Sequence, residues 1–579
     1  MKIKMKKIFA LVTLVLFVGL VACEKLDENL ENPSEVNPSN AQINDLYNNV
    51  QLTMASMMNG VWYYPASLVR MTANTSSYQY LNASNPSSFN GIWNTVYQVL
   101  WPDIDAVISL AEAQGSDIHI ANVKIMKAYS MMVMVDVFGD IPYTESLQGI
   151  GIISPSADQG TAIYNAAVDL LNEAITILES ETTAPTPTYD NFYNGDKSKW
   201  ATLAKTLKFR AAVTTRLVNP TESAGVINAL VSAGDLIDSS VEDFQFSYGT
   251  TRENPNSRHP RYNNSYETTD GDYMSNYYMW LLRAEKEDGS GNPIIDPRIR
   301  YYFYRQVEDA SALDDSEYSC HFSNTPDQSQ KPAWYTAIDS RMPYCVAYEG
   351  DGYLGRDHLN SEGIPPDGPL RTIYGLYPFG GLFDENSFDD QQQSGQTGAK
   401  GRGIWPIMLA SYTDFMRAEA ALTIGTTDNA RGLLESGVRK SITKVMGFES
   451  RDAATFSKQI NQRGVLISVK DAFVPDDADV DAYINHVLSL YDAAATDTER
   501  LNVVMKEYYI ALWGNGIEAY NMYRRTGMPL NMAPALESTP GAFMRSFFLP
   551  ADHVLRNQNA VQRQITDGVF WDNGSATVY

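Results

Sequence analysis

Aromatic and planar polar side chains gather in two segments of this chain, in a combination that suits the binding of a carbohydrate. The 579 residues include 35 Tyr and 9 Trp. A sugar has apolar C–H faces and a rim of hydroxyls, so its site needs flat rings for stacking and planar groups that form paired hydrogen bonds. The candidate ligand-binding residues are Trp62, Tyr63, Arg70, Tyr78 and Tyr80 in a Ser/Asn-rich segment, and Trp334, Tyr335 and Arg341 further along.

Core packing is the alternative for these rings, and it stays open for Trp62 and for the pair Trp334 and Tyr335. Three other rings, at i, i+4 and i+8, have the spacing of one helix face and are assigned to the core. They are Trp93, Tyr97 and Trp101. The segment 277–280 is either a further part of the binding surface or a buried helix.

Catalytic chemistry has little support in the sequence. A glycoside hydrolase needs two carboxylates about 5 to 10 Å apart. Asp351 with Asp357, or Asp384 with Glu385, could supply such a pair, but nothing in their spacing separates them from ordinary loop acids. The six His lack zinc-protease spacing, and there is no G-x-S-x-G elbow or phosphate-binding Gly-rich loop. No catalytic residue is predicted, and the chain is expected not to be an enzyme.

No cofactor or metal is expected either, with one alternative left open. Four aspartates close in sequence offer oxygen ligands for calcium: Asp476, Asp477, Asp479 and Asp481. Their segment lacks the glycine at the sixth position and the terminal bidentate glutamate of an EF-hand. Acidic residues at the start of a helix are explained more simply by the positive end of its dipole.

The charge balance excludes one class of partner. The chain carries 44 Lys and Arg against 69 Asp and Glu, a formal net charge of -25. Such a surface repels phosphate backbones, so nucleic acid is not expected to bind.

The amino terminus is typical of an exported protein. Four lysines precede an apolar run of 14 residues, 8–21, which is too short to span a bilayer but suits a signal peptide. The sequence Leu-Val-Ala-Cys at 20–23 resembles the lipobox of bacterial lipoproteins, which implies cleavage before Cys23 and its acylation. An ordinary signal peptide with an incidental cysteine is the alternative. The acidic stretch 24–28 resembles the surface-export tag of Bacteroidetes lipoproteins. We therefore expect an outer-membrane protein that is lipid-anchored and faces the outside.

Two further cysteines lie in the middle of the chain. Oxidation is permitted in an exported protein, so Cys320 and Cys345 could form a disulfide. Buried free thiols are an equal alternative.

Helical periodicity organises the rest of the sequence. Apolar residues at 163, 166, 167, 170, 171, 174, 175 and 178 follow one helix face, and 122–138 is apolar nearly all round, as in a central helix. Residues 236–404 are rich in Gly, Pro, Asn, Asp and Tyr and lose this pattern. We predict a mainly α fold: a discontinuous, tetratricopeptide-like scaffold of helix pairs with a large loop-rich insertion that carries short strands. The expected divisions are a signal peptide (1–22), a flexible lipid tether (23–39), the scaffold (40–235 and 405–527), the insertion with part of the ligand site (236–404) and an irregular tail packed on the scaffold (528–579).

Five segments in this order resemble the SusD/RagB family, in its SusD-like branch. They are 128–143, 199–210, 352–358 followed by 365–368, 415–420 and 515–527. The resemblance covers most of the chain. It implies four tetratricopeptide-like helix pairs, a ligand site built from loops outside them, and a TonB-dependent, SusC-like transporter over which the protein sits as a hinged lid. Tyr520 and Tyr523 stand where the family often has tryptophan.

The resemblance and the aromatic clusters together favour one function. The chain is predicted to capture an oligosaccharide or polysaccharide at the cell surface and to deliver it to the transporter. A RagB-type protein that captures oligopeptides is the alternative, and a surface glycoside hydrolase is a third possibility.

Overall fold

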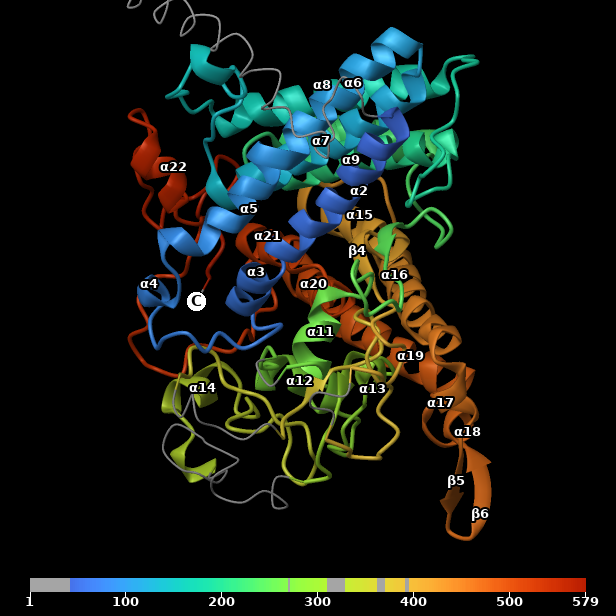
Figure 1. The fold of residues 1–579 in the computed structure, drawn as a ribbon. Helices are drawn as coiled ribbons and strands as arrows, with labels where there is room; N and C mark the ends of the chain where they lie inside the picture. The colour runs from blue at the N-terminus through green and yellow to red at the C-terminus, as the bar shows by residue number, and fades with distance from the viewer. Residues whose placement is uncertain (1–41, 269–270, 310–327, 362–369, 391–394, 579) are drawn as a thin grey trace, which may run out of the picture.

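The computed structural model describes residues 42–268, 271–309, 328–361, 370–390 and 395–578, and these form a mainly helical body (Figure 1). Cys23, Cys320 and the predicted signal peptide lie outside the described residues. Cys345 is buried and disulfide-bonded. No helix of the described residues is long and apolar enough to cross a bilayer.

The first half of the chain supplies one group of helices. They are α2 (Ile43–Gly60), α3 (Tyr63–Leu68), α4 (Tyr80–Ala83), α5 (Asn90–Asn94), α6 (Trp101–Gln114), α7 (Asp117–Phe138), α8 (Gly160–Glu179), α9 (Lys197–Thr215) and α10 (Pro220–Ala233). The helix α7 packs against α6 and α8, α8 against α9, and α9 against α10. Successive helices therefore stack as neighbours, in the tetratricopeptide-like manner predicted from the sequence.

A second group of helices follows in the last third of the chain. They are α15 (Ala410–Ile424), α16 (Ala430–Met446), α17 (Ala453–Ser457), α18 (Val469–Phe473), α19 (Asp477–Ala493), α20 (Asp497–Ala511), α21 (Gly516–Thr526) and α22 (Ala551–Arg556). The helix α15 packs against α10, α16 and α20, and α19 packs against both α16 and α20. Contact between α10 and α15 joins the two helical groups into one scaffold across the intervening segment.

Short elements occupy the segment between the two groups. They are α11 (Pro260–Tyr266), α12 (Asn276–Arg283), α13 (Ile299–Tyr302), α14 (Ala333–Ile338) and the strands β1 (Phe244–Ser247), β2 (Phe303–Tyr304), β3 (Ile373–Tyr374) and β4 (Ile404–Met408). The pairs β1–β4 and β2–β3 are antiparallel. A third antiparallel pair, β5 (Gln459–Gln462) with β6 (Val465–Ser468), projects from the body (Figure 1).

The helix α8 shows how the periodic pattern becomes packing. Its buried side chains include Ile163, Ala167, Leu171, Ala174 and Leu178, spaced by three or four residues along one face. The helix begins at Gly160. The carboxylate of Asp158, just before it, accepts hydrogen bonds from the amides of residues 143 and 144.

The structure confirms one prediction about burial and decides one alternative that the sequence left open. The helix α7 is buried on nearly every side, as its uniform apolar sequence predicts. The helix α12 buries Tyr277, Tyr278 and Trp280, so the core interpretation of this segment holds. Trp93 and Trp101 are also buried, and Tyr97 is half-buried between them.

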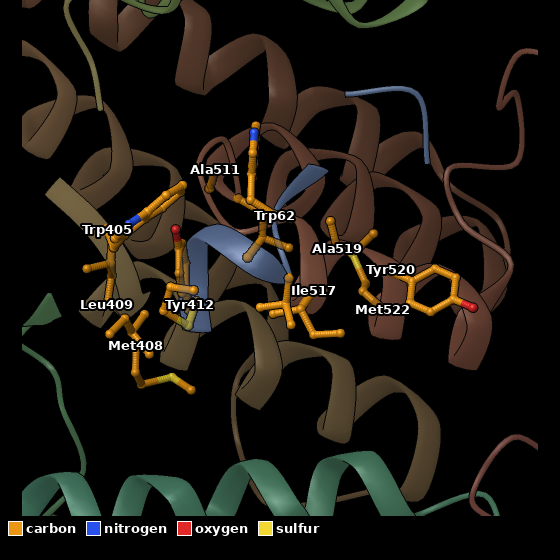
Figure 2. Close-up of a cluster of buried hydrophobic side chains, with 14 of the residues drawn as sticks. Trp62, Trp405, Met408, Leu409, Tyr412, Ala511, Ile517, Ala519, Tyr520 and Met522 are labelled. Carbon is orange, nitrogen blue, oxygen red and sulfur yellow. The ribbon is translucent and has the colours of Figure 1, made fainter. Parts of the chain in front are cut away.

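Rings from distant segments form the aromatic part of the core (Figure 2). The Trp62 ring meets Trp405, Trp513 and Phe379 with centroid distances of 6.3, 5.8 and 5.5 Å. The Trp62 indole N–H also donates to the hydroxyl of Tyr374 at 3.3 Å. These contacts fix the start of α3 against β4, the end of α20 and the insertion.

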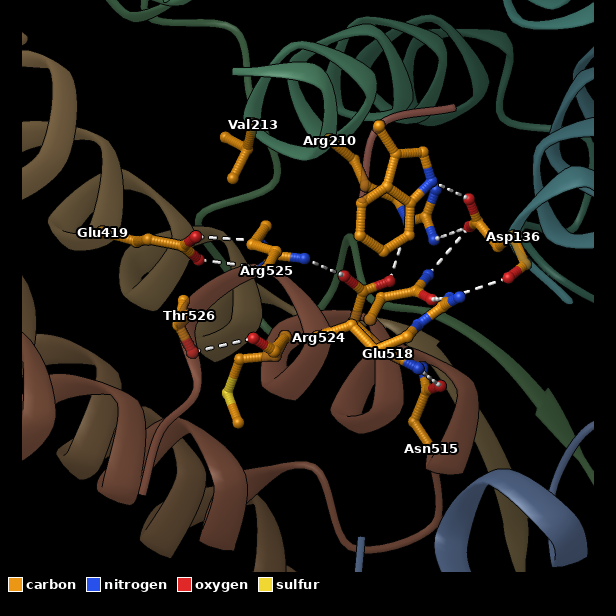
Figure 3. A network of polar contacts seen from close by, with 12 residues as sticks. Asp136, Arg210, Val213, Glu419, Asn515, Glu518, Arg524, Arg525 and Thr526 are labelled. Carbon is orange, nitrogen blue, oxygen red and sulfur yellow. Dashed lines mark hydrogen bonds and ion pairs between the residues drawn. The ribbon is translucent and has the colours of Figure 1, made fainter. Parts of the chain in front are cut away.

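A buried ionic network ties together segments that carried the family resemblance (Figure 3). Arg210 of α9 bonds Asp136 of α7 at 2.9 Å and Glu518 of α21 at 2.8 Å. Arg525 of α21 holds both oxygens of Glu419 of α15, at 2.7 and 2.8 Å. All five side chains are at most 2% exposed. The motif residues therefore join four helices of the scaffold.

Candidate functional site

Four of the eight predicted ligand-binding residues lie in the core. Trp62, Arg70, Tyr80 and Tyr335 are at most 1% exposed. The prediction that they belong to an exposed binding surface is wrong. Segments distant in sequence cover these four side chains, and the local composition around them does not predict this burial.

Arg70 instead fixes a buried junction between α3 and the C-terminal tail. Its guanidinium donates to the carbonyls of Ala533 at 2.8 Å and Leu68 at 2.6 Å, and to the hydroxyl of Tyr80 at 3.0 Å. The Tyr80 hydroxyl also hydrogen-bonds Nε2 of His358 at 2.9 Å. Burial, followed by the Arg70 charge, lowers the pKa of His358 well below its usual value, so this ring is neutral.

The tail segment 533–540 joins the two predicted clusters. Arg70 of the first cluster donates to Ala533, and the indole N–H of Trp334, in the second, donates to the carbonyl of Ala535 at 3.0 Å. The amide of Tyr80 donates to the carbonyl of Pro540 at 3.0 Å. Helices α4 and α14 accordingly lie beside the tail at the left of Figure 1.

A cavity of about 570 Å³ opens beside Trp334, within the size range of small-molecule sites. The Trp334 ring is half-buried and forms one wall. The tail supplies the other walls, including Phe543, Glu537 and Arg545. Arg545 is held by an ion pair with Asp572 at 2.6 Å. This cavity therefore combines an aromatic wall with a carboxylate and a fixed guanidinium, groups that can stack on a ring and hydrogen-bond its hydroxyls.

Tyr63 lines a second cavity, of about 540 Å³. Arg261 lies over the Tyr63 ring at 5.9 Å, bonds Asp272 at 3.2 Å and donates to Oδ1 of Asn59 at 3.0 and 3.1 Å. Burial, with a smaller contribution from Asp272, raises the pKa of Tyr63, so its hydroxyl stays protonated and can donate a hydrogen bond. Tyr64 contributes a second ring to the same wall.

Tyr78 and Arg341, the remaining predicted residues, are in different surroundings. Tyr78 is half-buried and packs against a small apolar cluster that includes Leu536 of the tail. The Arg341 side chain is 41% exposed and forms ion pairs with Glu287 at 3.3 Å and Asp339 at 3.6 Å. The structure thus brings Trp334 and Tyr78 to the tail, and places Tyr63 in a cavity lined by other segments.

The carboxylates considered for catalysis have structural partners. Asp351 bonds Arg283 at 2.8 Å, and Asp384 bonds Arg305 at 2.6 Å. Asp357 accepts hydrogen bonds from the Asn276 side chain at 3.1 Å and from a backbone amide at 3.0 Å. These interactions hold the insertion together.

The aspartates considered for calcium begin α19. The carboxylates of Asp476 and Asp479 each accept a hydrogen bond from the other's amide, which forms a capping box, and Asp481 bonds Arg439 at 2.9 Å. Within the described ranges, no group of three or more His, Cys, Asp or Glu side chains is placed to hold a metal ion.

Comparison with models of known protein families assigns this chain to a family. Residues 32–338 match the family model described as "Starch-binding associating with outer membrane", and residues 384–574 match the one described as "Susd and RagB outer membrane lipoprotein". The chain belongs to the SusD/RagB family. No curated protein matches this SusD-like chain.

Solved structures of other proteins share the fold. One is named a chitin-binding protein; at 19% identity it aligns over 92% of this chain and 100% of its own length, with a TM-score of 0.63. A chitin-binding SusD homologue from Flavobacterium johnsoniae (17% identity, 93% and 100% coverage) has a TM-score of 0.61. A SusD/RagB family protein from Bacteroides thetaiotaomicron (17% identity, 92% and 100% coverage) has a TM-score of 0.63.

Sequence reasoning missed the residues that complete both cavities. Glu537, Phe543 and Arg545 come from the irregular tail, and Arg261 and Asp272 come from the insertion. None has a periodic neighbourhood that would mark it. The aromatic content of the tail equals that of the whole chain, so composition offered no signal for them either.

Proposed function

We propose that this SusD-like protein captures an oligosaccharide and holds it in the Trp334 cavity. The observation that carries the proposal is the half-buried indole on the wall of a cavity that also contains Glu537 and Arg545. A sugar ring would stack on the indole while its hydroxyls bond the two charged groups. The family descriptions and the names of two structural relatives support a carbohydrate ligand.

The protein acts by binding alone in this proposal. No bond in the sugar is broken, because one carboxylate of each pair considered for catalysis, Asp351 or Asp384, is held by an arginine of the insertion. Incubation with the glycan is therefore expected to return it unchanged.

We place the protein on the outer face of the outer membrane. The family description of an outer-membrane lipoprotein supports this location, and acylation of Cys23 would provide the anchor. Residues 23–39 would act as the tether between the lipid and the helical body.

Delivery of the glycan to a SusC-like transporter is the last part of the proposal, with this protein as its lid. An exposed aliphatic patch supports a protein partner. Its two segments are joined by hydrogen bonds from Asn557 to the carbonyl of Pro155 at 2.8 Å and from Asn559 to the carbonyl of Ser154 at 2.6 Å. Helix α22 and the segment before α8 lie side by side in Figure 1. The patch consists of Leu147, Ile150, Ile153, Leu555 and Val561, which are 44–98% exposed.

Retention on glycan-containing gels tests the ligand. Slower migration with at least one neutral polysaccharide, reversed by Trp334→Ala, would support glycan capture. Failure with every glycan, together with the release of bound peptides upon denaturation, would instead establish a RagB-type peptide carrier.

Co-purification with the transporter tests the patch. Replacing Ile150 and Ile153 with aspartate should reduce the amount of transporter recovered. The same change at Val465 and Leu466, which are equally apolar and exposed on the β5–β6 hairpin, provides the control. Equal recovery from the patch variant and the wild type would exclude this docking surface.

A further inference from the structure

A third cavity differs in its charge from the rest of this acidic protein. It has a volume of about 590 Å³ and lies between the β1 and β4 segments and the end of α16. Four cationic side chains line it, against two carboxylates, Asp238 and Asp243. The cations are Arg439, Lys440, Lys444 and Arg451. This composition contrasts with a net charge of -25 for the whole chain.

Three of the four cations are already paired. Arg439 bonds Asp481 at 2.9 Å, Lys440 bonds Asp414 at 2.7 Å and Lys444 bonds Asp243 at 2.6 Å. These pairs account for most of the charge in the wall. Arg451 forms no ion pair with the described part of the chain, and it is therefore the cation available to a ligand.

Arg451 and Arg402 hold each other through backbone carbonyls. Nη1 of Arg451 donates to the carbonyls of Arg402 at 2.8 Å and Gly403 at 3.1 Å. Nη2 of Arg402 donates in return to the carbonyls of Arg451 at 2.5 Å and Ser450 at 3.3 Å. The arrangement fixes two guanidiniums near each other with no carboxylate within ion-pair distance among the residues described.

The guanidinium of Arg451 is a local binding point for an anion, in a wall that also contains the carboxylate of Asp238. Burial, and then the charge of Arg402, lower the pKa of Arg451 to about 10. Asp452 interacts electrostatically with Arg402, and its carboxylate accepts hydrogen bonds from Thr455. The Arg451 side chain also lies over the Phe448 ring at 4.5 Å, which orients it without neutralising it. Its Nε and Nη2 donate to none of the described residues.

The cavity wall also contains an unused hydrogen-bond acceptor. Oε1 of Gln245 is buried and accepts no hydrogen bond from the described residues. A buried acceptor without a donor costs stability, so it indicates that a donor is missing. Hydroxyl groups complete the polar lining: Ser239, Ser240, Ser411, Thr443 and Ser450.

We propose that this cavity is a second binding site, which takes the acidic sugar of a uronic-acid-containing oligosaccharide. The sugar carboxylate would accept hydrogen bonds from Nε and Nη2 of Arg451 in the paired geometry that guanidinium favours. A ring hydroxyl would donate to Oε1 of Gln245. A simple anion satisfies only the first interaction, and a neutral sugar only the second, so the two together select a sugar acid.

Calorimetric titration with trigalacturonic acid tests the site, with galactotriose as the uncharged counterpart and inorganic phosphate as the simple anion. We expect trigalacturonic acid to bind most tightly. Arg451→Gln should lower its affinity about tenfold or more, because a charge-assisted paired contact is lost. Gln245→Leu should weaken trigalacturonic acid but not phosphate, and this change removes no hydrogen bond within the described protein.

Two controls separate this site from folding defects and from the Trp334 cavity. Arg439→Gln removes a cation that lines the same cavity but is paired with Asp481, and it should leave the affinity unchanged. Arg451→Gln should lower the affinity for trigalacturonic acid in a Trp334→Ala background as well, which separates this site from the Trp334 cavity. If Arg451→Gln lowers the unfolding temperature, Gln245→Leu alone decides the question.

Three results would overturn the proposal. The first is that trigalacturonic acid does not bind, and the second is that galactotriose binds with equal affinity. The third is that Gln245→Leu leaves the affinity for trigalacturonic acid unchanged, as it does for phosphate.

Discussion

The indole N–H of Trp334 donates to the carbonyl of Ala535 at 3.0 Å, across 201 residues of sequence. This bond fixes one edge of the ring on the C-terminal tail, while the half-buried face of the ring lines the cavity. A ring held in this way loses little conformational freedom when a ligand binds, which favours affinity.

Trp334→Ala is expected to weaken glycan binding about tenfold or more. Stacking on an aromatic side chain contributes about 1–3 kcal/mol in analogous nucleic-acid sites. Trp334→Phe keeps an aromatic face but loses the bond to Ala535, so it should give an intermediate affinity. Affinity electrophoresis of both variants measures the effect. Unchanged mobility of the alanine variant would place the glycan elsewhere.

Trp62→Ala is expected to change stability rather than binding. Removal of a fully buried Trp ring costs about 3–5 kcal/mol, because the transfer free energy is lost and a cavity remains. Urea unfolding followed by tryptophan fluorescence measures this cost. A variant that keeps wild-type stability but loses glycan affinity would show that Trp62 reaches the ligand.

Arg210→Met is expected to destabilise the scaffold by about 3–5 kcal/mol, because it leaves buried carboxylates of Asp136 and Glu518 without this partner. The matched control is Arg431→Met, since Arg431 pairs with Asp492 on the exposed surface. Surface pairs contribute little to stability. Equal effects of the two changes on the urea midpoint would contradict the structural role of the buried network.

Acid is expected to weaken one ionic contact of the insertion. Burial alone would raise the pKa of Glu285, but Lys506 and Lys286 lower it to about 2. A lowered pKa in the folded state stabilises the protein above the unfolded-state pKa of about 4.3, by about 3 kcal/mol, and this contribution disappears as the pH falls towards 2.

Urea unfolding of the wild type and Glu285→Gln at several pH values checks this expectation. The difference in unfolding free energy should be largest near neutral pH and should shrink below about pH 4.3. A difference that stays constant between pH 6 and pH 3 would mean that Glu285 does not stabilise through its charge.

The scaffold could be predicted from the sequence because the local spacing of apolar residues determines its helices. The buried face of α8 repeats every three or four residues, and α7 is apolar on all sides, so both helices are visible without tertiary information. The segments that resemble the family also contact one another in the scaffold, through the ion pair of Arg210 and the ion pair between Arg525 and Glu419.

The candidate site could not be predicted in this way. Arg70 and Tyr80 have the composition of a polar loop, and only the return of the chain at Ala533 and Pro540 buries them. The walls around Trp334 come from Glu537, Phe543 and Arg545, which are more than 200 residues away in sequence. No local sequence pattern predicts a contact between segments so far apart. Composition therefore could not separate Trp334, which lines a cavity, from Trp62, which is buried.

The route of the tail also determines when the Trp334 cavity can form. Residues 534–545 form most of its wall, and they follow Trp334 in the chain. A chain that has not yet folded this segment against α14 lacks the wall. The proposed capture of a glycan therefore depends on a late folding step, the docking of the tail, and not on the helical scaffold alone.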